Sequence, residues 1–197
     1  MLRKLPIVCA MAAAAALCAA SAPAQDVAQR PFTKSDLSGW SGDRDTLPRM
    51  IRQIEGATGG RVLEIRYTTR DGPPGYHVAV FKGGRVTFLR VAAQGSDSAE
   101  LSAASLPEWM LKWKARADVN QALKATVPLA EAIRTGEQAA GGAPAVAAGI
   151  AASASNPPSD VQAYNVLIYR DGDVRRISVD DKTGQIIADP SALAEWP

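Results

Sequence analysis

Two segments of the chain carry apolar residues at a helical period. The first places them at i, i+3, i+4 and i+7 and the second at i, i+3 and i+4, so each predicts a helix with one apolar stripe. These residues are Leu47, Met50, Ile51 and Ile54 in the first segment, and Leu129, Ala132 and Ile133 in the second. We expect Asp45 or Thr46 to cap the first helix and Thr126 to cap the second. The pairs Gly59-Gly60 and Gly141-Gly142 are typical of helix ends.

Strand patterns follow both helices. Leu63, Ile65 and Tyr67 alternate with Glu64 and Arg66, which predicts a strand with its two charged side chains in water. Residues 76–81 and 164–169 are rich in β-branched and aromatic residues. Gly83-Gly84 and Asp171-Gly172 then predict tight hairpin turns into return strands at 85–91 and 174–179. A short last strand is expected at 185–187.

The strand segments are copies of one another. Residues 76–91 align without gaps to residues 164–179, so that Tyr76 and Tyr164 stand 88 positions apart. The glycine pairs at the helix ends are 82 positions apart, and the second copy therefore holds six extra residues before its tyrosine. We predict an α+β protein with two tandem units, each a helix packed on a three- or four-stranded antiparallel sheet, joined by a helical linker.

The boundaries of this organisation follow from the repeat. We expect a signal peptide, an N-terminal arm containing Trp40, a first unit, a linker with a helix from Pro107 to Leu123, and a second unit. Their ranges are 1–24, 25–45, 46–95, 96–125 and 126–197.

The first 24 residues have the pattern of a secretion signal. Arg3 and Lys4 precede an uncharged apolar stretch, and Ala22-Pro23-Ala24 fits the cleavage pattern. The alternative is an uncleaved membrane anchor, which the high alanine content of the stretch disfavours. Cleavage would remove both cysteines, Cys9 and Cys18, and leave no disulfide. We expect a periplasmic or secreted protein with no stable membrane insertion after cleavage.

Composition and charge narrow the classes of function. The 197 residues are 47% hydrophobic and 21% charged, which suits a folded core. The formal net charge is +2, and removal of the leader with its two basic residues brings it to zero. A nucleic-acid binder would need an excess of Lys and Arg, so no nucleic-acid partner is expected.

Candidate catalytic chemistry is sparse. His77 is the single histidine and lies in a predicted strand, where it lacks the cysteine or second histidine that a triad or a zinc site would use. Four aspartates at turns of the second unit, Asp171, Asp173, Asp180 and Asp181, could surround a hard cation, but their spacing does not fit an EF-hand loop. We predict no catalytic residue, no metal site, no cofactor and no enzymatic activity.

The order of motifs resembles the PepSY domain. In the second unit the glycine pair is followed by Tyr164-x-Val166 and then by Val179-Asp180-x-x-Thr183-Gly184. The first unit is similar to a divergent copy that keeps Gly59-Gly60 and Tyr76-x-Val78. The resemblance implies a non-catalytic module that binds a protein outside the cytoplasm, often a peptidase, and it implies no catalytic residues.

We therefore expect an exported PepSY-domain protein that binds or regulates another extracytoplasmic protein, with peptidase inhibition as the specific version. Candidate contacts are the exposed face of the sheet and the side chains of Trp109 and Trp113, which share one side of the predicted linker helix. The same tryptophans could instead pack the two units together. One alternative is a small-ligand or metal-responsive accessory protein of an envelope sensor, and another is a structural spacer.

Overall fold

The computed structural model describes residue 37 and residues 40–69, 73–93, 104–107, 113–151 and 162–187. For residues 104–107, 113–116 and 151 it describes the backbone alone. The predicted signal peptide, 1–24, and most of the predicted arm, 25–45, lie outside these ranges. All statements below refer to the described residues.

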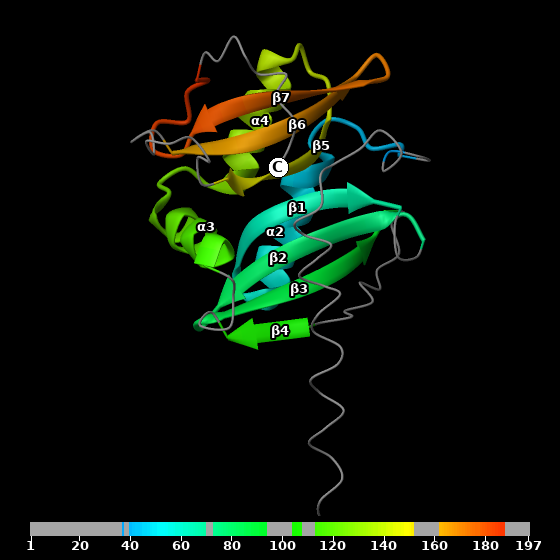
Figure 1. The fold of residues 1–197 in the computed structure, drawn as a ribbon. Coiled ribbons are helices and arrows are strands. Elements are labelled where there is room, and N and C mark those ends of the chain that lie inside the picture. Colours follow the sequence, from blue (N-terminus) through cyan, green and yellow to red (C-terminus); the bar gives the residue numbers. More distant parts are fainter. Residues whose placement is uncertain are drawn as a thin grey trace, which may run out of the picture.

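The first unit is a helix followed by three antiparallel strands (Figure 1). They are α2 (Thr46–Thr58), β1 (Arg61–Thr68), β2 (Gly75–Lys82) and β3 (Arg85–Ala92). The second unit repeats this order with α4 (Leu129–Ala139), β5 (Ala145–Ala151), β6 (Ala163–Arg170) and β7 (Asp173–Asp180). Between the units lie the short strand β4 (Ala104–Pro107) and the helix α3 (Trp113–Lys124).

The repeat predicted from the sequence is confirmed at the level of single strands. β6 and β7 begin and end 88 positions after β2 and β3. The two hairpin turns have positive φ at both central residues, 56° and 73° at Gly83-Gly84 and 54° and 79° at Asp171-Gly172. Both units also share an irregularity that the sequence did not reveal. β1 has an extra residue at Leu63 and β5 has one at Val146, each opposite the same position of the neighbouring hairpin.

The two units share one sheet, whereas the sequence predicted a sheet for each. The strand order is β4-β3-β2-β1-β5-β6-β7, and β1 pairs with β5 through Glu64–Gly149, Ile65–Ala148 and Arg66–Ala147. Two separate sheets would leave β1 and β5 as open edges with unpaired N–H and C=O groups, and pairing them satisfies both. The first strand of each copy therefore lies in the middle of a seven-stranded sheet.

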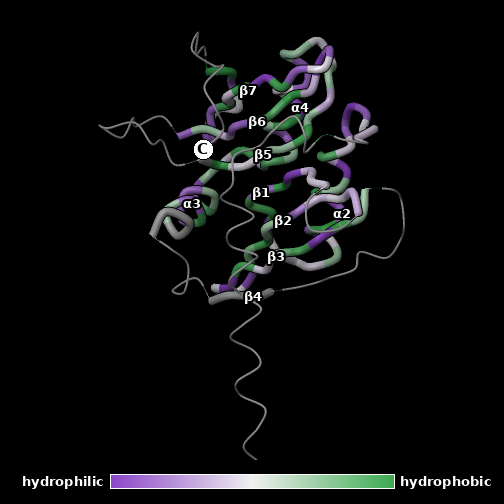
Figure 2. Tube along the Cα trace, turned by 45° about the vertical axis from the view of Figure 1, so that its right-hand side comes forward, coloured by the Kyte–Doolittle hydropathy of each residue, from purple (hydrophilic) through white to green (hydrophobic). Residues whose placement is uncertain are grey.

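Helices α2 and α4 lie side by side on one face of the sheet, behind it in the view of Figure 1. The main core lies between them and the sheet, and Figure 2 shows hydrophobic residues along the strands next to these helices. Its largest fully buried side chains include Tyr67, Tyr76, Tyr164, Leu47, Ile51 and Ile133. A smaller core forms on the opposite face, where Val119 and Ala122 of α3 pack with Leu63, Ala79 and Val86.

Several boundaries differ from the sequence prediction. Asp45 precedes α2 but makes no side-chain cap, and its N–H instead bonds to Glu137 of α4. α4 begins after Pro128, without a side-chain cap from Thr126. The linker helix begins at Trp113 and not at Pro107, because Pro107 belongs to β4. At the far end of the sheet, the expected last strand is reduced to one bridge between Val179 and Ile186.

Candidate functional site

The face of the sheet turned away from α2 and α4, called the distal face below, is the candidate functional surface. The strand registers align its side chains in two rows that cross both units. The first row is Arg90, His77, Arg66, Ala147, Leu167 and Arg176, from β3 to β7. The second row is Phe88, Ala79, Glu64, Gly149, Asn165 and Ser178. The repeat thus places polar side chains on this face in both units, and the buried apolar residues Ala147 and Leu167 lie between them in the first row.

Glu64 lies at the centre of the second row. Its neighbour across the junction is Gly149, where an added Cβ would come within 3.1 Å of the Cγ of Glu64. The Glu64 side chain therefore lies over the glycine. Burial raises the pKa of Glu64 to about 7, the Arg66 guanidinium opposes this shift, and Asp118 of α3 adds to it. A carboxyl group with this pKa changes charge near neutral pH.

Of the arginines on this face, Arg66 is the one that acts on the Glu64 carboxyl group. The alternation in β1 predicted that Glu64 and Arg66 face water, which is wrong for Arg66, only 6% exposed, and holds only in part for Glu64, which is half-buried. Val119 and Ala122 of α3 pack on this part of the distal face, and Asp118 of α3 acts on the Glu64 carboxyl group, which the pattern of one strand does not reveal. Arg90 of β3 contacts the Nε2 atom of His77 at 3.4 Å and donates a hydrogen bond to the carbonyl oxygen of Pro73.

The second unit adds neutral polar groups to the same surface. Ser178 donates a hydrogen bond from its Oγ to the Oδ1 of Asn165 at 3.1 Å. Arg176 completes the first row at β7, and its Nε is buried with no hydrogen-bond partner among the described residues. The first row thus holds three arginines, and the second row holds one titratable carboxyl group, that of Glu64. Such an arrangement suits recognition of carboxylates on another molecule.

Trp40 joins the two units beside this surface. Its Nε1–H donates to the hydroxyl oxygen of Tyr76 at 3.3 Å, and its ring makes edge contacts with Tyr67 of β1 and Tyr169 of β6. Leu37 and Trp40 also pack on the cluster of Val146, Ala147 and Leu167. Sequence reasoning placed Trp40 in an arm without a role.

The side chains of the two tryptophans that were predicted as partner contacts are not described by the structure. Trp109 lies outside the described residues, and Trp113 is the first residue of α3, where only the backbone is described. Their contact with a partner stays a prediction. The sequence analysis missed Glu64, Arg66 and Arg90 as a group because they come from three strands. The available signal was the repeat itself, which fixes the strands that lie next to each other within each unit.

The aspartates of the second unit do not gather at one point. Asp180 Oδ1 accepts the N–H groups of Lys182 and Thr183, and these bonds hold the pKa of Asp180 below its usual value. Asp181 is 1% exposed, and burial raises its pKa. Its carbonyl oxygen accepts the N–H groups of Thr126 and Val127. Through these two backbone hydrogen bonds, the turn that contains the Val-Asp-x-x-Thr-Gly motif holds the connection between α3 and α4 at the end of β7.

Asp171 pairs with the neighbouring Arg170 at 3.4 Å, away from the Asp180 turn. Within the part of the chain that the structure describes, no group of three or more His, Cys, Asp or Glu residues is placed to hold a metal ion. His77 lies in β2, the strand position predicted for it.

Comparison with known proteins identifies no family for this chain. No family model matches the chain, and no curated protein matches it either. A candidate lipoprotein of Clostridium difficile 630 is similar in structure, with 13% sequence identity and a TM-score of 0.41 over 76% of this chain and 94% of that one. The PepSY resemblance stays an interpretation of the motifs. None of the described helices is long and apolar enough to span a bilayer.

Proposed function

We propose that this chain is an exported, non-catalytic protein that binds another extracytoplasmic protein through the distal face of its sheet. The observation that carries the proposal is the pair of rows that cross both units, with Arg90, Arg66 and Arg176 in the first row and Glu64 in the second. In this account the target presents an acidic surface. A peptidase is the specific target that the PepSY resemblance implies, and binding would regulate it.

The form of the surface supports recognition of a macromolecule. The side chains of the two rows stand on hydrogen-bonded strands of one sheet, which is a rigid support. Little conformational entropy of the backbone is therefore lost on binding. The rows extend over six strands, a breadth that suits a protein surface better than a small ligand.

The local chemistry supports binding without catalysis. The single histidine contacts the guanidinium group of Arg90, and the described residues offer no cysteine or second histidine with which it could form a triad. The carboxyl group of Glu64 has the pKa of a general acid or base, but it lies between a glycine and an alanine in its row. In this proposal Glu64 adjusts the charge of the binding surface with pH.

The test begins with capture of a partner from a bacterial envelope extract by the full chain in its processed form, followed by binding measurements with the purified partner. Arg90→Glu reverses one charge of the first row. Arg52→Glu makes the same change on the exposed side of α2, on the opposite side of the sheet, and is the matched control. We expect Arg90→Glu to weaken saturable binding by about tenfold or more, as loss of one charged contact does, and Arg52→Glu to leave it unchanged.

Before binding is measured, an unfolding transition must show that both variants are folded. Equal affinity for the two variants would contradict binding through the distal face. Capture of no protein over a range of salt concentrations would contradict the proposed function itself. A target that is cleaved or modified by the chain would contradict the non-catalytic assignment.

A further inference from the structure

Asp181, the first residue after β7, has a buried carboxyl group without a hydrogen-bond partner. The residue is 1% exposed, and neither its Oδ1 nor its Oδ2 has a partner among the described residues. Burial of a polar group costs free energy unless hydrogen bonds compensate for it, and a charged carboxylate costs far more than a neutral one. The neutral carboxylic acid is therefore the form that this site favours.

The backbone of the same residue holds the connection between α3 and α4. The carbonyl oxygen of Asp181 accepts the N–H of Thr126 at 3.0 Å and the N–H of Val127 at 2.9 Å. These two residues lie between the end of α3 at Lys124 and the start of α4 at Leu129. A change in the position of Asp181 would therefore break both hydrogen bonds at once.

Two other contacts hold this connection without Asp181. Arg61 donates from its Nη2 to the carbonyl oxygen of Ala125 at 3.0 Å, and the hydroxyl of Tyr164 donates to the carbonyl oxygen of Val127 at 2.8 Å. Both contacts use carbonyl oxygens of the connection, whereas the bonds to Asp181 use its N–H groups. Loss of the bonds to Asp181 would therefore loosen the connection and expose its N–H groups without detaching it.

The charged groups near Asp181 act in opposite directions. Those around Asp181 and the neighbouring hydroxyl of Tyr164 are Asp180, Lys182, Arg61 and Glu55. Burial raises the pKa of the Asp181 carboxyl, Asp180 adds to this shift, and Lys182 opposes it. Tyr164 stays neutral at and below neutral pH, because burial raises its pKa as well.

We propose that Asp181 is a pH-dependent switch: its neutral carboxyl group keeps the connection between α3 and α4 bound to the end of β7, and its charged form releases Thr126 and Val127. The charged carboxylate turns toward water, because burial of an unpaired charge costs more than two backbone hydrogen bonds contribute. Val119 and Ala122 of α3 pack on the distal face, so the switch sets how firmly this helix is held there. The inference does not rest on the proposed function, since it concerns the protein without a partner.

Nuclear magnetic resonance of the full chain in its processed form follows both parts of the switch. The carboxyl carbon shift of Asp181 reports its protonation, and the protection factors of the Thr126 and Val127 amides report their hydrogen bonds. The bound proton stabilises the connection, so protection is full at low pH and is lost as the pH rises through the folded-state pKa of Asp181.

The expected result is a fall in both protection factors by about tenfold or more, the effect of one or two hydrogen bonds, in parallel with the carboxyl titration. The measurements cover roughly pH 4 to pH 8. Constant protection over this range, or titration of Asp181 at the ordinary pKa of an aspartate, would overturn the proposal.

Variants separate Asp181 from the other titrating groups. Asp181→Asn removes the titration at nearly the same shape and should keep both amides protected at every pH. Asp181→Leu does the same without a polar group, and it keeps the test open if the amide of asparagine unfolds the turn. Asp171→Asn, at an exposed residue of the turn between β6 and β7, is the matched control and should follow the parent. A pH-dependent loss of protection in both Asp181 variants would overturn the switch.

A divalent cation is the other occupant that two carboxylate oxygens without a protein partner could take. Magnesium or calcium chloride is added at the upper end of the pH range and compared with sodium chloride at equal ionic strength. The proton switch predicts no difference between the salts. A saturable change of the Asp181 carboxyl signal, with protection of Thr126 and Val127 restored by the divalent ion, would overturn the assignment to a proton.

Discussion

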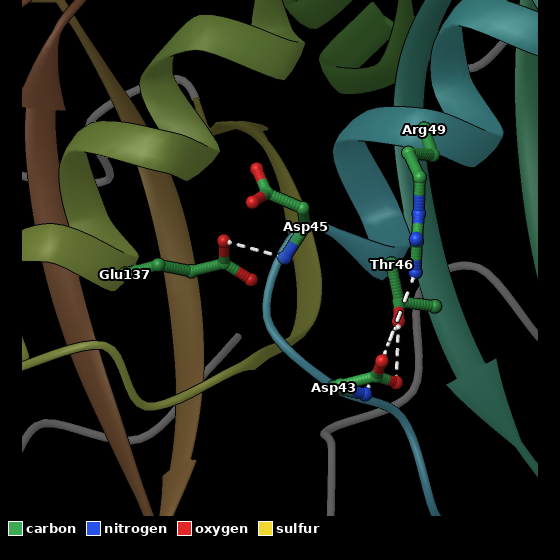
Figure 3. Close-up of polar contacts among 5 residues, drawn as sticks. All are labelled: Asp43, Asp45, Thr46, Arg49 and Glu137. Atoms are coloured by element: carbon green, nitrogen blue, oxygen red, sulfur yellow. Dashed lines mark hydrogen bonds and ion pairs between the residues drawn. The ribbon is translucent and has the colours of Figure 1, made fainter.

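The carboxyl group of Glu137, on the first helix of the second unit, binds the backbone at the start of the first unit. Its Oε2 accepts the N–H of Asp45 at 3.1 Å (Figure 3), and its Oε1 accepts the N–H of Ala145 at 2.9 Å. Glu137 lies on α4 and is fully buried, and Asp45 is the residue before α2. The side chain of Asp45 also pairs with Arg134 at 3.2 Å. One carboxyl group therefore fixes how the two helices lie against each other.

Replacement of Glu137 by Gln keeps the shape but turns one acceptor oxygen into a donor. We expect the free energy of unfolding to fall by about 1–3 kcal/mol, the cost of a buried polar group left unsatisfied. Glu131→Gln, on the exposed side of the same helix, is the control and should change it by less than about 0.5 kcal/mol. Denaturant unfolding measures both. Equal effects would show that the Glu137 contacts contribute nothing.

Trp40 should stabilise both units together. Trp40→Ala removes contacts to Tyr67 and Tyr169, in different units, and should cost about 2–3 kcal/mol. Trp40→Phe keeps a ring and loses the bond to Tyr76, so its cost should be about 1 kcal/mol. Unfolding should stay a single transition in both variants. Loss of one unit alone, seen as two transitions, would contradict one cooperative sheet.

Two helical glycines should respond in opposite directions to substitution by alanine. Nothing lies within 4 Å of a Cβ at Gly56 on α2, and Gly56→Ala should stabilise the protein by about 0.5–1 kcal/mol. A Cβ at Gly136 on α4 would meet the side chain of Val166 at 3.1–3.4 Å. Gly136→Ala should therefore destabilise the protein by about 1 kcal/mol, the cost of overpacking. Thermal unfolding compares them, and a gain at Gly136 would show that α4 is not held against β6.

Prediction from the sequence succeeded where the determinants are local. The glycines of the two hairpin turns and the alignment of Tyr76 with Tyr164 fixed β2, β3, β6 and β7, because turn geometry sets the register of a hairpin. The pairing of β1 with β5 was missed, since it joins residues about 80 positions apart and has no turn to mark it.

The site was harder to predict for the same reason. Glu64 looked exposed because alternation in β1 reports only that two faces exist, not what covers each one. The cover comes from α3, which packs near Leu63, the extra residue of the bulge. Arg90 and Arg176 joined the surface through registers with other strands. The short helix α3 and the strand β4 lie in a segment with no periodic pattern strong enough to bound them.

Glu64 should give the protein a pH-dependent stability. Its pKa is raised from 4.5 to about 7 in the folded chain, so the protonated form stabilises the fold. That contribution is fully present below about pH 4.5 and is lost as the pH rises through about 7, with a size on the order of 2–3 kcal/mol. Glu64→Gln should remove this part of the pH dependence.

The comparison of parent and variant isolates Glu64, because burial also raises the pKa values of Glu137 and Asp181. Unfolding free energies measured from pH 4 to pH 8, roughly the window of this titration, give the two profiles. Parallel profiles for the parent and Glu64→Gln would contradict the burial of this carboxyl group. Glu131→Gln should follow the parent.

The most direct test of the account is a nuclear magnetic resonance titration of the isotope-labelled chain with its captured partner. The account predicts that the largest amide shift changes fall on the distal-face residues His77, Arg90, Asn165 and Ser178. Residues on the exposed sides of α2 and α4, such as Arg52 and Glu131, should change little. Changes concentrated on these two helices, with the distal face unaffected, would contradict binding through the sheet.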